Sequence, residues 1–285
     1  MSPARATWLG HASVTLDLPA PDGVVRLVTD PVLRRRVGPL VRDPALPLED
    51  AWAGADAVLL SHLHHDHADL PSLRRFDRAP VAVHEANAAW LARRGSNAAG
   101  LDDWSWWSPA PGVEVARVPT IHHARPMPHR PNAVCGFLIR TAELAVWFAG
   151  DTELFPELGD LAAMAGRPID LALVPIAGWG PRLSPGHLGP DEAAEAIARV
   201  GARHTIAIHH ATLRPAGWPA GRRAWMTAPL ARFAEVLPRR SDSVLHPLAC
   251  GESSFSPTPP ADHTPPPPPS YFPSKGHSEV VERAL

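Results

Sequence analysis

A dense group of histidines and one carboxylate lies at residues 62–67, in the order His-Leu-His-His-Asp-His. The group directly follows an apolar run that has the composition of a buried strand. In an extended chain, side chains two residues apart point to the same side, so His62 and His64 could both reach one cation. Asp66 and His67 follow after a turn and would serve another cation. The segment therefore predicts a pair of adjacent metal ions.

The residues alone leave a second interpretation open, because a solvated histidine-rich loop would also gather imidazoles. We favour the metal site, since polar loops seldom follow buried strands with ligand-type residues at such regular offsets. His65 is the odd member of the group and is not expected to bind metal.

Three more ligand-type residues each follow a strand-like run further along the chain: His122, Asp151 and His209. Loops positioned by a rigid scaffold carry function more often than the strands themselves. A lone histidine at a strand end is more often structural than a ligand. Together with residues 62–67, however, these three predict one shared site.

The hydrophobic periodicity alternates strands with helices in both halves of the chain and predicts an α/β fold with mixed sheets between helices. Strands are expected at residues 13–18, 24–29, 57–61, 79–83, 113–118, 136–141, 144–149, 171–175 and 205–208. Helices are expected at residues 70–76, 85–94 and 190–200.

The composition changes abruptly to prolines from residue 256. Such a segment cannot continue a sheet or a helix. We therefore predict one folded domain over residues 1–255 and an extended, disordered Pro-rich tail over residues 256–285.

Bulk properties exclude several classes of protein. The 285 residues can bury a sizeable core, and a net charge of −2 gives no general basic field for nucleic acid. No run reaches the length of a membrane span, and the N-terminus lacks the apolar stretch of a signal peptide. The two cysteines are expected to be free thiols. These features predict a cytoplasmic location and no nucleic-acid partner.

The string at residues 62–67 resembles the hallmark of the metallo-β-lactamase superfamily, and the resemblance extends over residues 6–254. It implies a four-layer αββα sandwich of two mixed β-sheets, with the metals at one edge between the sheets. It also implies two divalent ions, zinc being preferred and manganese or iron also acceptable to nitrogen and carboxylate ligands.

The resemblance assigns seven metal ligands. The first ion would be bound by His62, His64 and His122, the second by Asp66, His67 and His209, with Asp151 as the bridge. Within the pairs His122-His123 and His209-His210 either histidine could be the ligand. We choose the first of each, because residues 119–122 and 208–212 resemble the P-x-x-H and I-H-x-x-T segments of the family.

Four further segments resemble one branch of the superfamily, which contains the phospholipase D that hydrolyses N-acyl-phosphatidylethanolamine and the ascorbate-6-phosphate lactonase. These segments are residues 8–13, 29–31, 148–152 and 186–190. The chain departs from the branch at His210-Ala211, where relatives commonly carry tryptophan and glycine. That departure puts the shape of the pocket near His209 in question.

Several residues are candidates for supporting roles. Asp66, Asp151 and His187 are the candidate catalytic residues, and His187 could protonate a leaving group or hold an oxyanion. Arg125 and His187 are candidates for binding substrate, because guanidinium groups bind phosphate and carboxylate bidentately. Asp30 could orient a metal-bound histidine through its free ring nitrogen. Each also has a structural alternative, as a cap or a surface residue.

The predicted function is hydrolysis by a metal-bridging hydroxide, since two metals lower the pKa of a shared water from 15.7 towards roughly 7. The substrate would be anionic, a phosphodiester of a lipid or a small metabolite. A lactonase or carboxylic ester hydrolase is the alternative, because the same ligands serve attack on phosphorus and on carbonyl carbon. The remaining alternative is a metal-binding protein without catalytic activity.

Overall fold

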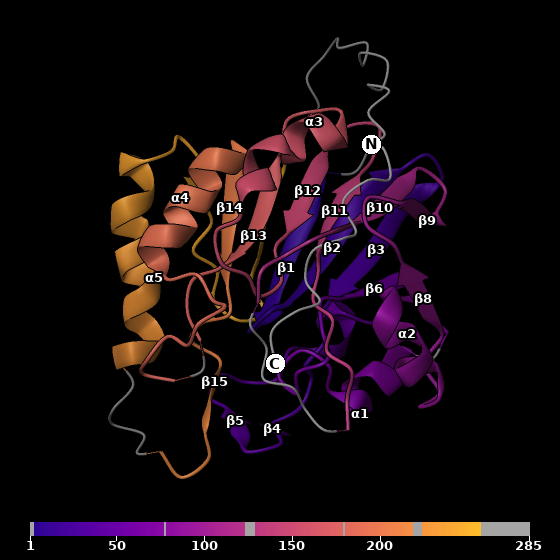
Figure 1. Ribbon diagram of the computed structural model, residues 1–285, viewed down its shortest axis with the longest axis horizontal. Helices are drawn as coiled ribbons and strands as arrows, with labels where there is room; N and C mark the ends of the chain where they lie inside the picture. The colour runs from indigo at the N-terminus through magenta and orange to yellow at the C-terminus, as the bar shows by residue number, and fades with distance from the viewer. Residues whose placement is uncertain (1–2, 77, 123–128, 179, 219–223, 258–285) are drawn as a thin grey trace, which may run out of the picture.

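The computed structural model describes residues 3–76, 78–122, 129–178, 180–218 and 224–257. Within these residues two large mixed sheets pack face to face and helices cover their outer faces (Figure 1). The predicted αββα sandwich is thereby confirmed. Most of the Pro-rich segment, residues 258–285, lies outside the described residues, so the domain boundary near residue 255 stays a prediction.

The first sheet combines antiparallel strands at one edge with parallel strands at the other. Strands β17, β1, β2 and β3 pair antiparallel, and β3, β6, β7 and β8 continue in parallel. Their bounds, in sheet order, are β17 Ser253–Ser254, β1 Arg5–Gly10, β2 Ser13–Ala20, β3 Gly23–Thr29, β6 Ala57–Leu60, β7 Val81–His84 and β8 Ala98–Leu101.

The second sheet is built in the same way. Strands β9 to β12 form an antiparallel meander, and β12, β13, β14 and β16 are parallel. Their bounds are β9 Trp106–Ala110, β10 Val113–Val118, β11 Gly136–Arg140, β12 Ala145–Phe148, β13 Leu171–Pro175, β14 His204–Ile208 and β16 Val244–Leu245.

Shorter elements complete the described chain. A small sheet lies at the bottom of Figure 1 and contains β4 Arg36–Val37, β5 Leu40–Arg42 and β15 Leu213–Pro215. The α-helices are α1 Leu70–Leu73, α2 Glu85–Ala92, α3 Leu161–Ala165, α4 Pro190–Val200 and α5 Ala224–Val236. The 3₁₀ turns are η1 Glu49–Ala51, η2 Arg74–Phe76, η3 Pro156–Asp160 and η4 Leu237–Arg239.

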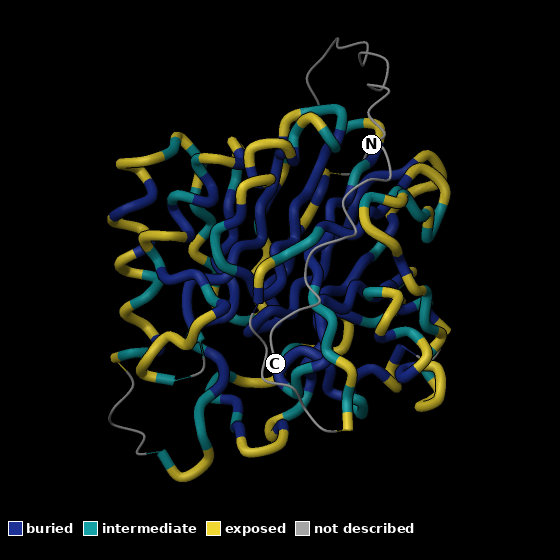
Figure 2. The backbone as a smooth tube through the Cα atoms, in the orientation of Figure 1, coloured by how far each residue is buried: buried dark blue, intermediate teal, exposed yellow. Residues whose placement is uncertain are grey.

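Alternation along the strands produces the layers. On β12, Val146 and Phe148 belong to the core between the two sheets, whereas Ala145 and Trp147 belong to the core under α3 and α4. Successive side chains of a strand point to opposite faces, so a strand with no polar side chain can fill two cores at once. Figure 2 shows the central strands of both sheets largely buried, with exposed residues on the outer sides of the helices.

The predicted strands and helices are all present, with ends that agree within two residues, except that α1 ends at Leu73 and residues 74–76 form the 3₁₀ turn η2. Helix α4 begins at Pro190 as predicted, and the Glu192 carboxylate accepts a hydrogen bond from the backbone N–H of Gly189 at 2.7 Å. Strand β1 and helix α5 were not predicted. Pro229 lies inside α5 and interrupts the helical signal. Both cysteines are free, and no helix within the described ranges is long and apolar enough to cross a membrane.

Gly150 marks the turn that carries the chain from β12 to Asp151. Its φ angle is +62°, and an added Cβ would lie 2.8 Å from the carbonyl oxygen of Cys135 and 2.8 Å from the Cβ of Ser61. The end of the strand can therefore approach the segment before His62 only because this residue has no side chain.

We expect Gly150→Ala to lower the free energy of unfolding by about 2–4 kcal/mol. The strain of a left-handed backbone at a non-glycine residue and the steric overlap of the new Cβ both contribute to this loss. Gly201→Ala is the matched control, because Gly201 has a φ of +67° and no atom within 4 Å of an added Cβ. We expect this control to lose about 1 kcal/mol, from strain alone. Urea unfolding of both variants measures the difference, and equal losses would contradict the steric argument.

Candidate metal centre

The ends of strands from both sheets meet at one place. Asp30 follows β3, His62 comes two residues after β6, Asp151 comes three residues after β12, and His209 follows β14 directly. All four are buried. Polar side chains that follow buried strands are thus brought together from segments far apart in the sequence, as the sequence predicted for the last three.

The first group of ligand atoms consists of His62, His64 and His122. The Nε2 atom of His62 lies 3.0 Å from Nδ1 of His64, and Nε2 of His122 lies 3.5 Å from that same atom. The three ligand atoms lie within 4.8 Å of one another. This is the set of residues predicted for the first metal ion.

Hydrogen bonds on the far side of the rings fix how this group presents its nitrogens. His122 donates its Nδ1–H to the carbonyl of Gly186 at 2.7 Å. The Ser61 hydroxyl donates to Asp30 at 2.6 Å, so it accepts from Nδ1 of His62 at 2.9 Å. Both Nε2 atoms therefore direct a lone pair at the centre of the group, which is the arrangement that metal-binding histidines require.

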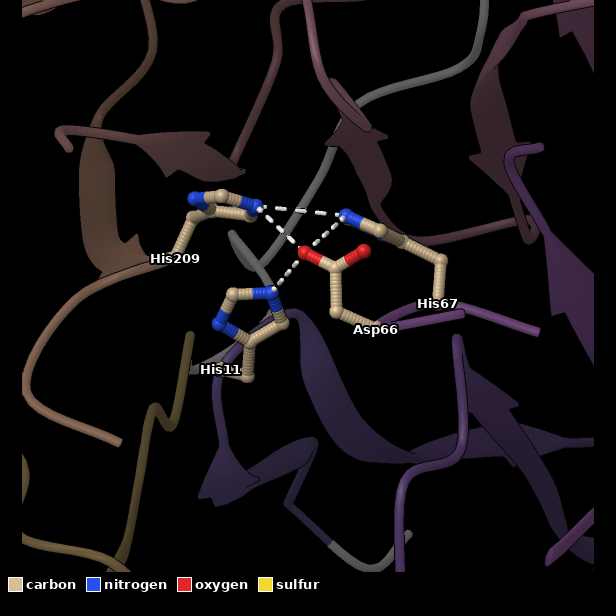
Figure 3. Close-up of side chains that lie close together, drawn as sticks. All are labelled: His11, Asp66, His67 and His209. Atoms are coloured by element: carbon tan, nitrogen blue, oxygen red, sulfur yellow. Dashed lines mark hydrogen bonds and ion pairs between the residues drawn. The ribbon is translucent and has the colours of Figure 1, made fainter. Parts of the chain in front are cut away.

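The second group consists of His11, Asp66, His67 and His209, and Figure 3 shows the four side chains converging. The Oδ2 atom of Asp66 lies 3.0 Å from Nε2 of His11 and 3.7 Å from Nε2 of both His67 and His209. His209 donates its Nδ1–H to the carbonyl of Ala177 at 2.7 Å, which turns Nε2 towards Asp66. Three of these residues were predicted, whereas His11 was not.

Asp151 lies between the two groups. Its carboxylate oxygens are 3.1 Å from Nε2 of His67 and 3.3 Å from Nε2 of His209, both in the second group. The same carboxylate is 3.8 Å from Nε2 of His62 in the first group. Its Oδ1 atom is buried and, within the described residues, has the ion pair with His209 but no hydrogen bond of standard geometry. The carboxylate thus lies between the two groups of ligand atoms.

Asp30 lies behind both groups and has no exposed surface. Its carboxylate accepts from Nδ1 of His67 at 2.7 Å, and from the backbone N–H and the hydroxyl of Ser61 at 2.7 and 2.6 Å. Because Ser61 in turn accepts from His62, one carboxylate orients a histidine in each group. The contact predicted for Asp30, to the far nitrogen of a histidine in the site, is present.

The second group is strongly charged. Burial alone would raise the pKa of Asp66 and of Asp151, but nearby histidines hold both pKa values well below the ordinary range. Burial would likewise lower the pKa of His67 and His209. The carboxylates, Asp151 foremost, instead raise the pKa of His67 well above its usual value and that of His209 to about 9.

The first group is neutral by comparison. Burial and then the charge of His67 hold the pKa of His62 well below its ordinary value, and burial lowers that of His64 to about 4. Burial also lowers the pKa of His122.

Both groups fit divalent cations. Neutral imidazoles with converging lone pairs are ready ligands. In the second group, the protons on His67 and His209 supply the positive charge that a divalent ion would supply beside two carboxylates. The donor set of nitrogen and carboxylate oxygen atoms, without thiolate, suits zinc.

Other candidate residues are placed as follows. His187 lies at the rim, with Nε2 3.3 Å from Asp151 and its ring 4.7 Å from that of His122. The ring of His65 lies 6.4 Å from that of His129, and the described groups of ligand atoms do not include it. Arg125 lies outside the described residues.

The structure describes three of the four histidines in the pairs His122-His123 and His209-His210. His210 turns away from the site, and its ring stacks on Trp8 at a centroid distance of 4.7 Å. His209 and His122 both face the site. His123 lies outside the described residues. The flat ring of His210 thus packs against the flat ring of Trp8.

His11 is the site residue that the sequence reasoning missed. It is a single histidine in a hairpin turn between β1 and β2, and no neighbouring ligand-type residue draws attention to it. The available signal was the segment 8–13, which resembled the family branch but received no role at the site.

Comparison with known proteins agrees with this geometry. The model of the β-lactamase superfamily domain matches residues 25–210. The chain is 29% identical over 269 residues to N-acyl-phosphatidylethanolamine-hydrolyzing phospholipase D 1 of Caenorhabditis elegans, covering 83% of this chain and 70% of that protein. It is 31% identical over 224 residues to a metal-dependent hydrolase of Pelotomaculum thermopropionicum, covering 75% of this chain and 86% of the relative.

A solved structure shares the fold. A metallo hydrolase from Ignicoccus hospitalis superposes with a TM-score of 0.68 at 19% identity, over 89% of this chain and 98% of that one. The family match over residues 25–210 covers most of β3 and all of β6, β7 and β8 in the first sheet, every strand of the second sheet except β16, and the histidine-rich segment. The chain therefore belongs to the β-lactamase superfamily and, within it, to the metal-dependent hydrolases.

Proposed function

We propose that the protein is a binuclear metal-dependent hydrolase. The observation that carries the proposal is the position of Asp151, between a neutral group of three histidines and a charged group containing Asp66, His67 and His209. His62, His64 and His122 would hold the first ion. The second group would hold the other, with Asp151 shared by both.

Zinc is the proposed metal, because all seven donor atoms are imidazole nitrogens or carboxylate oxygens. When bound, the two ions supply a hydroxide nucleophile at neutral pH and polarise the bond that is hydrolysed. The residues of the chain hold Asp66 and Asp151 ionised and aim the ring nitrogens at the centre.

The proposed substrate is a phosphodiester. Two divalent ions carry more charge than Asp66 and Asp151 together, so the site attracts anionic groups and stabilises negative charge that develops on them. The Caenorhabditis elegans relative is named a phospholipase D, an activity that cleaves a phosphodiester, which supports the same class here. A lipid or a small metabolite could carry the phosphodiester.

His187 is proposed to act on the substrate. Its Nε2 atom faces Asp151 at the rim of the site, while Nδ1 lies 3.1 Å from the carbonyl of Ser184. A histidine held in this way can donate a proton to a leaving oxygen. Arg125 remains a proposed phosphate-binding residue, on the ground that its guanidinium suits a phosphate.

Our first test of the proposal measures metal content and hydrolysis together. We expect the protein to bind two zinc ions per chain and to hydrolyse bis(4-nitrophenyl) phosphate in preference to a panel of lactones and a chromogenic cephalosporin. Removal of metal with a chelator should abolish the activity, and zinc should restore it. His64→Ala should lower kcat/KM by more than about 100-fold, since loss of a ligand exceeds the effect of losing its outer partners.

The matched control is His65→Ala, which removes a neighbouring histidine that does not face the site. It should keep the metal content and the activity of the parent protein. Activity on lactones alone would replace the phosphodiester with the lactonase alternative. A protein that binds no metal and is inert towards all three substrate types would contradict the enzyme proposal.

A second prediction concerns Asp30. Oδ1 of Asp30 accepts from the backbone N–H of Ser61, and Oδ2 accepts from both His67 and the Ser61 hydroxyl. In Asp30→Asn one of these oxygens becomes a donor, so the side chain can no longer accept on both sides. We expect zinc affinity to fall by about 10- to 100-fold, the usual effect of losing an outer partner of metal-bound histidines. Competition with a coloured chelator measures it. Asp56→Asn, at an exposed carboxylate that accepts from the backbone of Arg26, is the control and should have no effect.

A third prediction follows from the charges of the metal-free site. The pKa values of His67 and His209 are raised, the latter to about 9, so at pH 7 this pair of rings holds excess positive charge. A metal ligand must be neutral, so we expect the second ion to release more protons than the first and to bind more tightly as the pH rises towards 9. Calorimetry in buffers of different ionisation enthalpy counts these protons. Equal proton release by both ions would disprove the assigned difference between the groups.

A further inference from the structure

Hydrogen bonds fix the backbone of His11 at both its carbonyl and its N–H. Its carbonyl accepts from the backbone N–H of His209 at 2.9 Å and from Nε1 of Trp8 at 3.0 Å, while its own N–H donates to the hydroxyl of Thr212 at 2.7 Å. Its φ angle is +53°, a conformation that L-residues rarely adopt. The position of the ring is therefore set by contacts to the loop after β14 as well as by the β1–β2 turn.

The side chain of His11 is also held in place. The residue is 1% exposed, and its ring centroid lies 4.0 Å from that of His209. Its Nε2 atom lies 3.0 Å from Oδ2 of Asp66. An ionised carboxylate only accepts hydrogen bonds, so the proton of the His11 ring is on Nε2. Figure 3 shows the ring directed at the carboxylate.

His11 thus joins ligand residues from the two halves of the chain. Through its ring it holds Asp66, and through its carbonyl it holds the backbone of His209. Both bonds act on the second group, whereas within the described residues no hydrogen bond or ring contact joins His11 to His62, His64 or His122.

We propose that His11 is a positioning residue for the second metal ion, which it supports by hydrogen-bonding Asp66 rather than by binding metal itself. This inference rests on the two-ion centre proposed above. The proton on Nε2 of His11 occupies the position from which this atom would bind metal. Through its hydrogen bond to Asp66, the ring instead restricts the rotation of the carboxylate, whose remaining lone pairs stay available for the ion. Loss of the His11 side chain should weaken the binding of the second ion and leave the binding of the first ion unchanged.

Three variants test the inference by zinc titration followed by calorimetry and by metal analysis. His11→Phe keeps a flat ring against His209 but removes the donor. His11→Gln supplies an amide N–H at a comparable distance from the backbone. His65→Gln is the control for loss of a histidine near the site. We expect His11→Phe to bind the second ion about 10- to 100-fold more weakly, and His11→Gln to recover most of that affinity.

The affinity for the first ion serves as the internal control for folding and should be unchanged in all variants. If His11→Phe does not fold, the affinity of His11→Gln for the second ion, compared with that of the parent protein, still tests the inference. Wild-type affinity for both ions in His11→Phe would overturn the inference alone. Equally weak binding of the second ion by the Gln and Phe variants would also overturn the inference, because it would indicate that the ring itself binds metal. A parent protein that binds a single ion would overturn the two-ion proposal as well.

Discussion

The architecture of the site depends on the burial of three carboxylates in one small volume. Asp30, Asp66 and Asp151 are 0%, 6% and 3% exposed. Ionised groups are removed from water at high free-energy cost unless hydrogen bonds and opposite charges surround them. Here Ser61 and His67 satisfy Asp30, while protonated histidines or metal ions balance the other two. A site of this kind is stable only when every partner is in place.

The two sheets provide the rigidity that such a site needs. The proposed ligands and the residues that orient them lie in turns that follow buried strands, and the backbones of three of these turns are themselves unusual. His11, Asp30 and His209 have φ angles of +53°, +32° and +62°. Non-glycine residues adopt such angles only where the surrounding structure determines them, and they concentrate at functional sites. The packing between and outside the sheets therefore holds strained turns in the geometry that points side chains at a common centre.

The sequence predicted the layered fold because strand and helix periodicities are local properties. It also predicted most of the site, since each ligand-type residue follows an apolar run. What it missed depends on tertiary contact. His11 has no ligand-type residue beside it in the sequence, and its importance comes from contacts to Asp66 and His209, which lie far from it in the sequence. Helix α5 was missed because Pro229 conceals its periodicity. The stacking of His210 on Trp8 could not be predicted, because the two rings meet only when the strands are assembled.

The order of the ligands along the chain has a consequence for how the protein is made. Residues 62–67 leave the ribosome early and already contain several of the nitrogen donors, whereas His209 follows much later. Contacts between such distant residues give the fold a high contact order and form late in folding. Until β14 is synthesised and docks, residues 62–67 supply only part of the proposed set of ligands. The complete donor set is therefore a property of the assembled fold rather than of the nascent histidine-rich segment.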